Sequence, residues 1–167
     1  MVIGGAAVIA LGVPRSTAAV DATILAEDPE ELVATFRSER IVGREADLVE
    51  LARTYRVLHM VHEPSGVPVD VSLASLPFEE AAIARRQIVR FERVAIPVPR
   101  AEDLIVYKLI AARRRDLDDV EMLLVIHGET VDVARVRKVV GEFCEVLEDS
   151  SRLRALDDVL KRVRAGA

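Results

Sequence analysis

Two stretches in the first half of the chain alternate apolar and polar residues, and this period of two predicts β-strands. Residues 17–25 form the first stretch, with Asp21 on the face opposite an apolar row. Residues 67–73 form the second, with Asp70 again opposite an apolar row, and they follow a hairpin turn at residues 64–66. Successive side chains of a strand point to opposite faces, so we expect both carboxylates to be open to whatever the sheet binds.

The remainder of the first 98 residues also predicts a mixture of helices and strands. We expect Gly4-Gly5 to form a tight turn between a strand at residues 2–3 and a short helix at residues 6–11. Asp28 has the residue type of a helix N-cap, and its helix is expected to end near residues 41–43. The other expected elements are a helix at 46–54, a strand at 56–62, a helix at 76–86 and one or two strands within 88–98.

From residue 100 onward, apolar residues recur every three or four positions, which predicts helices. The expected helices are residues 101–112, 117–127, 132–147 and 151–164. We therefore expect an α/β (α+β) fold class with two regions. Residues 1–98 would form an α/β core, and residues 99–167 would form a helical C-terminal region that completes the site.

Composition places the chain among ordinary globular proteins, since 167 residues with 51% apolar content suffice for one compact core. The single cysteine, Cys144, excludes a disulfide framework, and no apolar stretch reaches membrane-spanning length, so we expect a cytoplasmic protein. Residues 85–115 hold nine Lys or Arg and three acids, a local charge of +6, whereas the rest holds 14 basic and 25 acidic residues. This basic stripe indicates an anionic ligand such as a triphosphate or an RNA backbone; a solvated helix face is the alternative.

Asp21 and Asp70 are the candidate metal ligands, because carboxylates on adjacent strands supply the hard oxygen atoms that Mg²⁺ prefers. Gly4 and Gly5 are candidate phosphate contacts, because a residue without a Cβ lets backbone N–H groups approach phosphate oxygens. The alternative is that both acids are surface residues at strand ends. The two histidines within residues 59–62 have no cysteine or acid at ligand spacing, so we expect no zinc site.

Several motifs together resemble the minimal nucleotidyltransferases of the AbiEii toxin type, which belong to the DNA polymerase β-like nucleotidyltransferase superfamily. They are Gly4-Gly5, residues 12–21 (GVPRSTAAVD), residues 66–70 (GVPVD), residues 102–109 (EDLIVYKL) and residues 115–119 (RDLDD). The resemblance covers roughly residues 2–125. It implies a nucleotidyltransferase-like mixed sheet with flanking helices.

The resemblance implies a nucleotide-binding site beside the glycine pair. Gly4 and Gly5 would build this site, with Arg15 and Thr17 near the phosphates or supporting the acidic strand. Lys108 would contact the triphosphate; an ordinary solvated lysine is the alternative. The implied cofactor is Mg²⁺, and the implied substrate is an NTP.

The resemblance also gives roles to four aspartates. Asp21 and Asp70 would be the metal ligands. Asp116 and Asp119 lie three residues apart and share one helix face, so they would orient the basic residues or the end of the substrate. The alternative for Asp116 is that it caps the start of the next helix.

Ala19 is the plain departure from the family pattern. The family carries an Asp-x-Asp motif on the strand, and Ala19 stands where the first of these acids is expected. Loss of a carboxylate shared by two metal ions lowers metal affinity and disturbs the in-line geometry, so we expect catalysis to be impaired. Ala19 is either an engineered knockout or a natural loss. A strand as short as residues 2–3 is unusual at a chain start, so we expect Met1 to lie inside a longer ancestral domain. The absence of the helix that the family carries ahead of the Gly-Gly strand is a second departure.

The leading hypothesis is Mg²⁺-dependent transfer of an NMP group from an NTP to a hydroxyl acceptor. The resemblance makes the acceptor a tRNA 3′ end or a protein side chain, and the setting a toxin–antitoxin pair with a cognate antitoxin protein. The second hypothesis is a non-catalytic nucleotide- or partner-binding module that kept the fold. A third, transfer to a small molecule such as an aminoglycoside antibiotic, predicts an acidic acceptor cleft, and the basic stripe argues against it. The sequence indicates no membrane partner and leaves the oligomeric state open.

Overall fold

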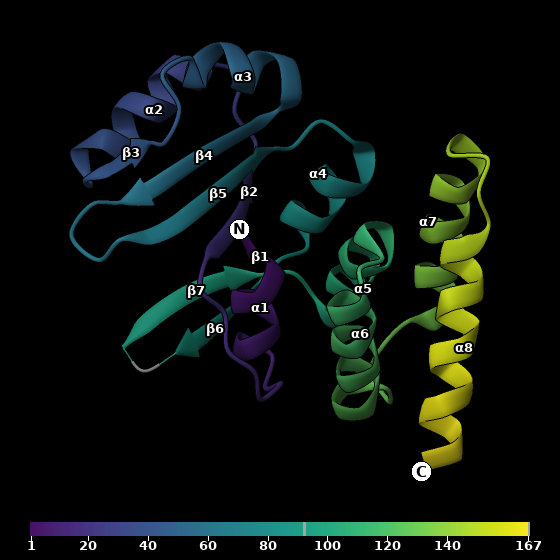
Figure 1. The fold of residues 1–167 in the computed structure, drawn as a ribbon. Coiled ribbons are helices and arrows are strands. Elements are labelled where there is room, and N and C mark those ends of the chain that lie inside the picture. The colour runs from purple at the N-terminus through teal and green to yellow at the C-terminus, as the bar shows by residue number, and fades with distance from the viewer. Residues whose placement is uncertain (92, 167) are drawn as a thin grey trace.

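The first half of the chain forms a five-stranded mixed sheet with the strand order β1-β2-β5-β4-β3 (Figure 1). The computed structural model describes residues 1–91 and 93–166. The strands of this sheet are β1 (Val2–Ile3), β2 (Val20–Ile24), β3 (Ile41–Gly43), β4 (Val57–His62) and β5 (Val67–Leu73). β2 and β5 run parallel, whereas the other neighbouring pairs of the sheet are antiparallel. The parallel pair is the one that carries both predicted metal ligands.

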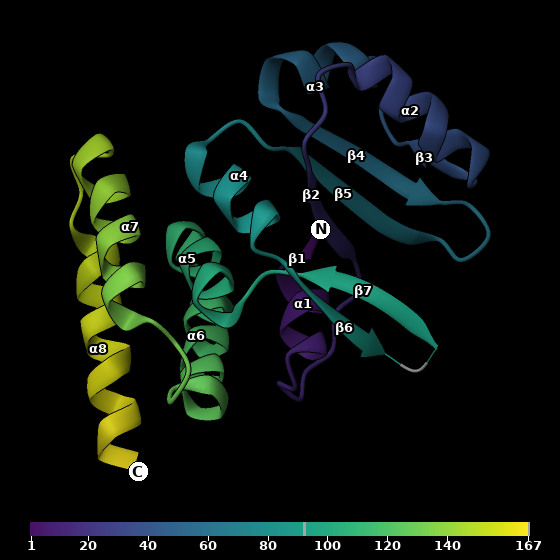
Figure 2. The same ribbon diagram turned by 180° about the vertical axis from the view of Figure 1, so that it is seen from behind.

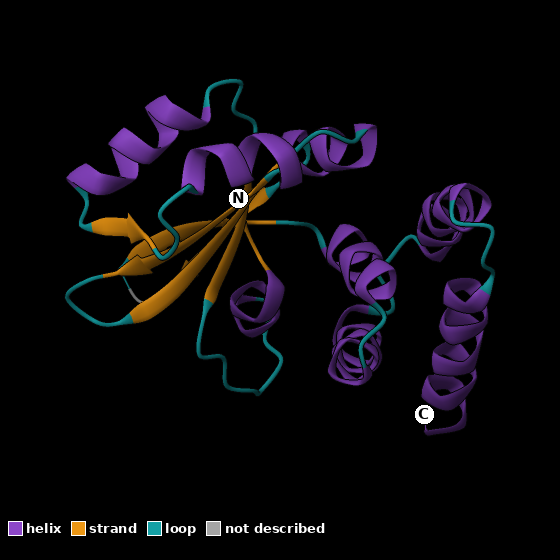
Figure 3. Ribbon diagram, turned by 45° about the horizontal axis from the view of Figure 1, so that its top comes forward, coloured by secondary structure: helices purple, strands orange, loops and turns teal. Residues whose placement is uncertain are grey.

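The two faces of the sheet differ in what they contact. On β5, Val69, Val71 and Leu73 are buried in an apolar cluster, as the alternation predicted. This cluster is closed by α2 (Pro29–Ser38) and α3 (Leu48–Tyr55), which cover one face of the sheet (Figure 3). The opposite face is left for Asp21 and Asp70.

The C-terminal half is helical, as predicted, and shares its core with the first helix of the chain. Its helices are α5 (Ala101–Ala111), α6 (Arg114–His127), α7 (Val133–Val146) and α8 (Ser151–Gly166). A second apolar cluster joins them to α1 (Gly4–Ala10) through Ala7 and Val8, which are fully buried. Figures 1 and 2 show α5 and α6 between the sheet and the α7–α8 pair. No helix within the described residues combines the length and the apolar character that crossing a membrane requires.

A helix and a hairpin connect the two halves. The helix is α4 (Pro77–Ala84), and the hairpin consists of β6 (Gln87–Phe91) and β7 (Val94–Val98), which form a separate two-stranded sheet. Val89 and Ile96 are register partners in the middle of the hairpin and pack against the second cluster. The rest of the hairpin projects from the body of the protein (Figure 2).

These elements confirm the predicted fold class, a mixed α/β sheet followed by helices, but some boundaries were wrong. Gly4-Gly5 form no separate turn, because α1 begins at Gly4 itself, with a positive φ of 60°. The strand predicted at residues 17–25 begins only at Val20, since its ladder with β5 starts there and residues 17–19 have no strand partner.

Two further boundaries moved because of contacts that the apolar pattern does not encode. α2 ends at Ser38, and residues 41–43 form β3, because they pair with β4. α6 begins at Arg114 rather than at residue 117. Its start is fixed by Asp116, whose side chain accepts a hydrogen bond from the Arg113 backbone N–H. Polar capping of this kind lengthens a helix beyond its apolar stripe.

Candidate active site

Two carboxylates lie on neighbouring strands on the face of the sheet that α2 and α3 leave open. Asp21 on β2 and Asp70 on β5 are register partners in the parallel ladder. Register partners project from the same face of a sheet, so the two side chains share one site. Gly5 donates its backbone N–H to the Asp21 carboxylate. The start of α1 is thus attached to the acidic strand by a hydrogen bond.

The glycine pair is required by close packing at the start of α1. A Cβ at Gly4 would lie 2.0 Å from Asp21 Oδ2, and the backbone there has a φ of +60°, which favours glycine. A Cβ at Gly5 would lie 2.8 Å from Thr17 Oγ1 and 3.2 Å from Arg15 Nη2. The loop that precedes β2 therefore rests directly on the first turn of α1.

Asp21 carries an electrostatic strain that its neighbours only partly relieve. Burial raises the pKa of Asp21, and the charge of Asp70 raises it further. The Gly5 hydrogen bond and the charges of Lys108 and Arg113 act in the opposite direction without cancelling the rise. Two carboxylates that share a site oppose each other's ionisation, and an added cation or a proton relieves the repulsion.

Asp70 has two partners that the sequence reasoning missed. Arg44 donates from Nη2 to Asp70 Oδ1 over 2.7 Å, and His59 Nδ1 lies 2.8 Å from the same oxygen. Strand alternation could have revealed His59, because β4 places it directly opposite Asp70 in the antiparallel ladder. Arg44 follows the end of β3, and no pattern in the sequence pointed to it.

A buried ion network supports the site from the helical half. Lys108 on α5 places Nζ 2.8 Å from Asp116 Oδ1 and 2.8 Å from Asp119 Oδ2, both on α6. Arg15, in the loop before β2, also pairs with Asp119. The network therefore joins three segments that are far apart in the sequence: the loop, α5 and α6.

This network corrects two of the alternatives from the sequence. Lys108 is not a solvated lysine, because only 7% of it is exposed, and Asp116 and Asp119 are buried with it. Asp116 is not the N-cap residue of α6, because Arg113 occupies that position; Asp116 is the third residue of the helix and caps it from there. Its carboxylate has two partners, the Lys108 ammonium and the Arg113 backbone N–H.

Ala19 lies in the bend immediately before β2, two residues from Asp21. Its carbonyl oxygen accepts a hydrogen bond from Thr17 Oγ1 over 3.1 Å. The backbone here is thus held in place, while the methyl side chain of Ala19 supplies no ligand for a metal ion. Of the expected Asp-x-Asp motif, only Asp21 remains.

The carboxylates present fit one divalent cation. Across residues 1–91 and 93–166, no group of three or more His, Cys, Asp or Glu side chains has a metal-binding arrangement. Mg²⁺, however, is commonly held by one or two carboxylates, and substrate phosphates and water fill its other positions. Burial and then the charge of Asp70 oppose the ionisation of Asp21 and raise its pKa, and a cation beside the pair would offset both effects. A second ion does not fit equally well, because the acid expected at Ala19 is absent.

The structure gathers the predicted residues into one continuous cluster. In order of contact, its members are Asp70, Asp21, Gly4, Gly5, Thr17, Arg15, Asp119, Lys108 and Asp116. Arg44, His59 and Arg113 belong to the same cluster and were not predicted. The run Arg113-Arg114-Arg115 at the start of α6 was the available signal for Arg113, since it follows the predicted triphosphate lysine within the basic stripe.

A mixed sheet with paired acids on parallel neighbouring strands, next to a helix that begins at Gly-Gly, defines a protein of the nucleotidyltransferase class. The chain belongs to the family of nucleotidyltransferases of unknown function (DUF6036), whose family model matches residues 1–164. No curated protein matches the chain. Family membership confirms the predicted nucleotidyltransferase superfamily, whereas the AbiEii type stays a prediction.

Proposed function

We propose that the chain binds an NTP together with Mg²⁺ at the Asp21–Asp70 pair, and that Ala19 leaves NMP transfer to a hydroxyl acceptor impaired. The single observation that carries this proposal is the pair itself. Burial raises the pKa of Asp21, and the like charge of Asp70 on the adjacent strand raises it further, so the pair lowers the stability of the fold around Asp21. Groups that cost stability in this way are typical of functional sites.

The roles of the residues follow from their positions. Asp21 and Asp70 would hold the cation. Arg44 and His59 would release the Asp70 carboxylate when the cation binds, since their side chains are 39% and 41% exposed and can move away. Mg²⁺, when bound, supplies charge neutralisation for the triphosphate and the leaving pyrophosphate. Arg113 would bind phosphate oxygens near Asp21, with the Lys108 charge adding to the positive potential.

The same reasoning gives the helical half a part in the site. Arg15 reaches from the loop before β2 to Asp119 on α6, and Asp119 also binds Lys108 on α5. These contacts support the proposal that residues 99–167 complete the site built by residues 1–98. Gly5 and Thr17, which pack together, would border the phosphates on the other side.

For the acceptor we propose an RNA 3′ hydroxyl, as at a tRNA end, and for the setting a toxin–antitoxin pair. The basic stripe of residues 85–115 supports a polyanionic acceptor over a cationic antibiotic, which an acidic cleft would suit better. The resemblance to AbiEii-type toxins supports the pairing with an antitoxin. Ala19 favours a second candidate, a nucleotide-binding module without catalysis.

Restoring the missing acid separates these two candidates. The wild-type chain, Ala19→Asp and Ala19→Asn would each be incubated with Mg²⁺, one α-³²P-labelled NTP at a time and total tRNA. Ala18→Asp is the matched control, because it adds the same charge at the exposed neighbouring residue. We expect label transfer with Ala19→Asp to exceed that of the other three proteins by at least about 100-fold, the typical weight of one electrostatic stabiliser.

Each outcome bears on a different part of the proposal. Label on tRNA only with Ala19→Asp supports an impaired tRNA nucleotidyltransferase. Equal labelling by the wild-type chain would overturn the impairment. If no protein transfers label but calorimetry detects Mg²⁺-dependent NTP binding that Asp21→Asn abolishes, the binding-module candidate replaces the enzyme. Absence of both would overturn the nucleotide site.

A further inference from the structure

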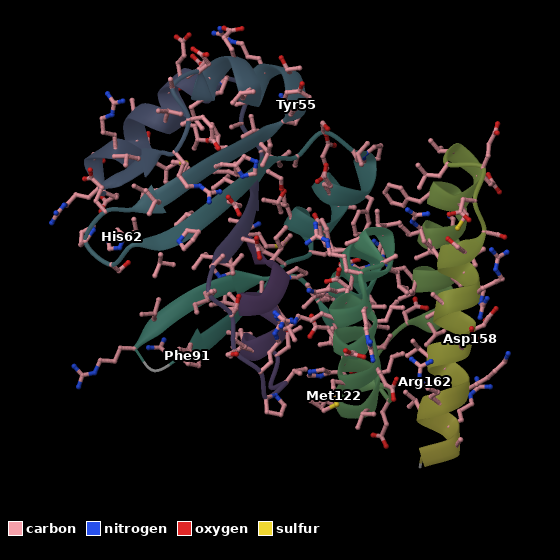
Figure 4. All side chains as sticks on the ribbon, viewed as in Figure 1. Tyr55, His62, Phe91, Met122, Asp158 and Arg162 are labelled. Atoms are coloured by element: carbon pink, nitrogen blue, oxygen red, sulfur yellow. The ribbon has the colours of Figure 1, made fainter. Side chains whose placement is uncertain are left out.

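The β6–β7 hairpin exposes large apolar side chains away from both apolar clusters. Ile88, Phe91 and Val94 are 60%, 52% and 61% exposed. Phe91 and Val94 are register partners at the end of the hairpin. Figure 4 shows Phe91 by this hairpin, well away from the helical half of the protein. Ile88 pairs with Pro97 near the base of the hairpin, so Phe91 and Val94 form its apolar tip. Large apolar side chains exposed on a projecting element indicate an interaction surface.

Four arginines lie along this region, and we refer to them as the hairpin arginines: Arg90 and Arg93 beside the tip, and Arg86 and Arg100 at the base of the hairpin. All are exposed, and none has a carboxylate partner within the described part of the chain. Arg86 and Arg100 donate only to backbone carbonyl oxygens. Residues 86–100 hold these four arginines and one acid, a net charge of +3 in a chain of −5. The hairpin is therefore a cationic surface on an acidic protein.

The hairpin borders the candidate active site. Figures 1 and 2 show it projecting on the same side of the molecule as the β4–β5 hairpin, with the start of β2 between the two. It contacts β1 and α1, which carries Gly4 beside Asp21. Burial and then the charge of Arg86 lower the pKa of the Met1 amino group, which donates to the Thr23 carbonyl oxygen on β2. The hairpin therefore lies against β1 and α1, which border the strand that carries Asp21.

We infer that the β6–β7 hairpin is the docking surface for a single-stranded RNA acceptor, an inference that rests on the proposed nucleotidyl transfer. The hairpin arginines would bind its phosphates, and Phe91 would stack on a base near the 3′ end. Proteins that bind single strands combine these two contacts, because every base has a stacking face and every residue of the strand carries a phosphate.

Charge favours RNA over an acidic protein as the occupant. The hairpin arginines are spread from one residue before β6 to two residues beyond β7 rather than gathered at one point. Such spacing suits a polymer whose charges repeat regularly. The remainder of the chain outside residues 85–115 is acidic and repels RNA, which would confine the strand to this surface and lead it to the site.

Fluorescence anisotropy with a 3′-hydroxyl, 5′-fluorescein 12-nucleotide RNA tests the docking surface. The variants are Arg86→Ala/Arg90→Ala/Arg93→Ala and Phe91→Ala, with Phe91→Trp as the conservative replacement. The matched control is Arg37→Ala/Arg154→Ala/Arg164→Ala, which removes three exposed arginines elsewhere. Loss of three phosphate contacts should reduce the slope of log K against log salt concentration by about 2. Phe91→Ala should weaken binding by about tenfold, and Phe91→Trp should restore it.

A second ligand separates this inference from the proposed function. Binding of a fluorescent NTP with Mg²⁺ should be the same in the wild-type chain and in all hairpin variants. RNA binding that the control triple variant weakens as much as the hairpin triple variant overturns the docking surface. The docking surface is also overturned if polyglutamate of equal charge competes as effectively as unlabelled RNA, because that result would indicate an acidic protein partner. If NTP binding persists in either of these two outcomes, the proposed nucleotide site is still supported.

Discussion

Replacement of Lys108 by Met should be among the most destabilising single changes in this protein. Lys108 is 7% exposed and neutralises two carboxylates that are themselves 8% and 5% exposed, Asp116 and Asp119. Met keeps most of the volume, so the loss is mainly electrostatic. Removing one partner of a buried ion pair costs about 3–5 kcal/mol, because the remaining charge stays buried. Arg15 still binds Asp119, so we expect the lower half of this range.

Urea unfolding followed by circular dichroism measures this loss. With a slope m of about 2 kcal/mol per M, the midpoint should fall by about 1.5–2 M with m unchanged. Lys161→Met is the matched control: its pair with Asp158 is 77% and 63% exposed, and exposed pairs contribute about 0–1 kcal/mol. In Lys108→Met/Asp116→Asn one buried charge is also removed, so this variant should be more stable than Lys108→Met. A loss below about 1 kcal/mol, or strict additivity in the double variant, would refute the reasoning.

Two further changes test the glycine and carboxylate geometry. Asp21→Asn should raise the melting temperature at pH 7, and the gain should vanish as the pH falls toward 4. The pKa of Asp21 is raised in the native state, so at pH values between its ordinary and its raised pKa the native state binds more protons than the unfolded state. The stability of the wild-type chain therefore falls as the pH rises through this range, and the Asn side chain removes this loss. Differential scanning fluorimetry across this pH range would contradict the assignment if the gain grew toward low pH. Gly4→Ala should abolish NTP binding measured by calorimetry, because its Cβ would meet Asp21 Oδ2, whereas Gly66→Ala, at a similar φ with open space around it, should lose stability only.

The sequence predicted the strands that carry the carboxylates because burial on one face imposes an alternation that is visible along the chain. Asp21 and Asp70 could be assigned to strands in this way. Their register, Asp21 opposite Asp70, depends on a parallel pairing between segments nearly fifty residues apart, which no local pattern encodes. The resemblance to a known family supplied the link between them.

Side chains that act through long-range ion pairs were harder to predict. Arg44 binds Asp70 only because β3 pairs with β4, and the helical start at Asp28 had suggested a helix that continued through this segment. Lys108 was placed in the site from a motif, but its burial between two acids was not foreseen. A lysine on a predicted helix is exposed by default, and only the approach of α6 to α5 makes it a buried charge.

The two parts of the site differ in a way that makes Ala19 testable without any substrate. The Lys108 network is neutralised and holds the loop before β2, whereas Asp21 and Asp70 repel each other across the strands. A third carboxylate at Ala19 would be two residues from Asp21, which is about 7 Å along an extended backbone. At an effective dielectric constant of about 20 it would add about 2 kcal/mol of repulsion. Ala19→Asp should therefore melt about 4–8 °C below the wild-type chain without divalent cations. Mg²⁺ should restore the loss in this variant and not in Ala18→Asp, since only a carboxylate beside Asp21 can share the ion. Equal melting of the two variants with and without Mg²⁺ would place residue 19 outside the cation site.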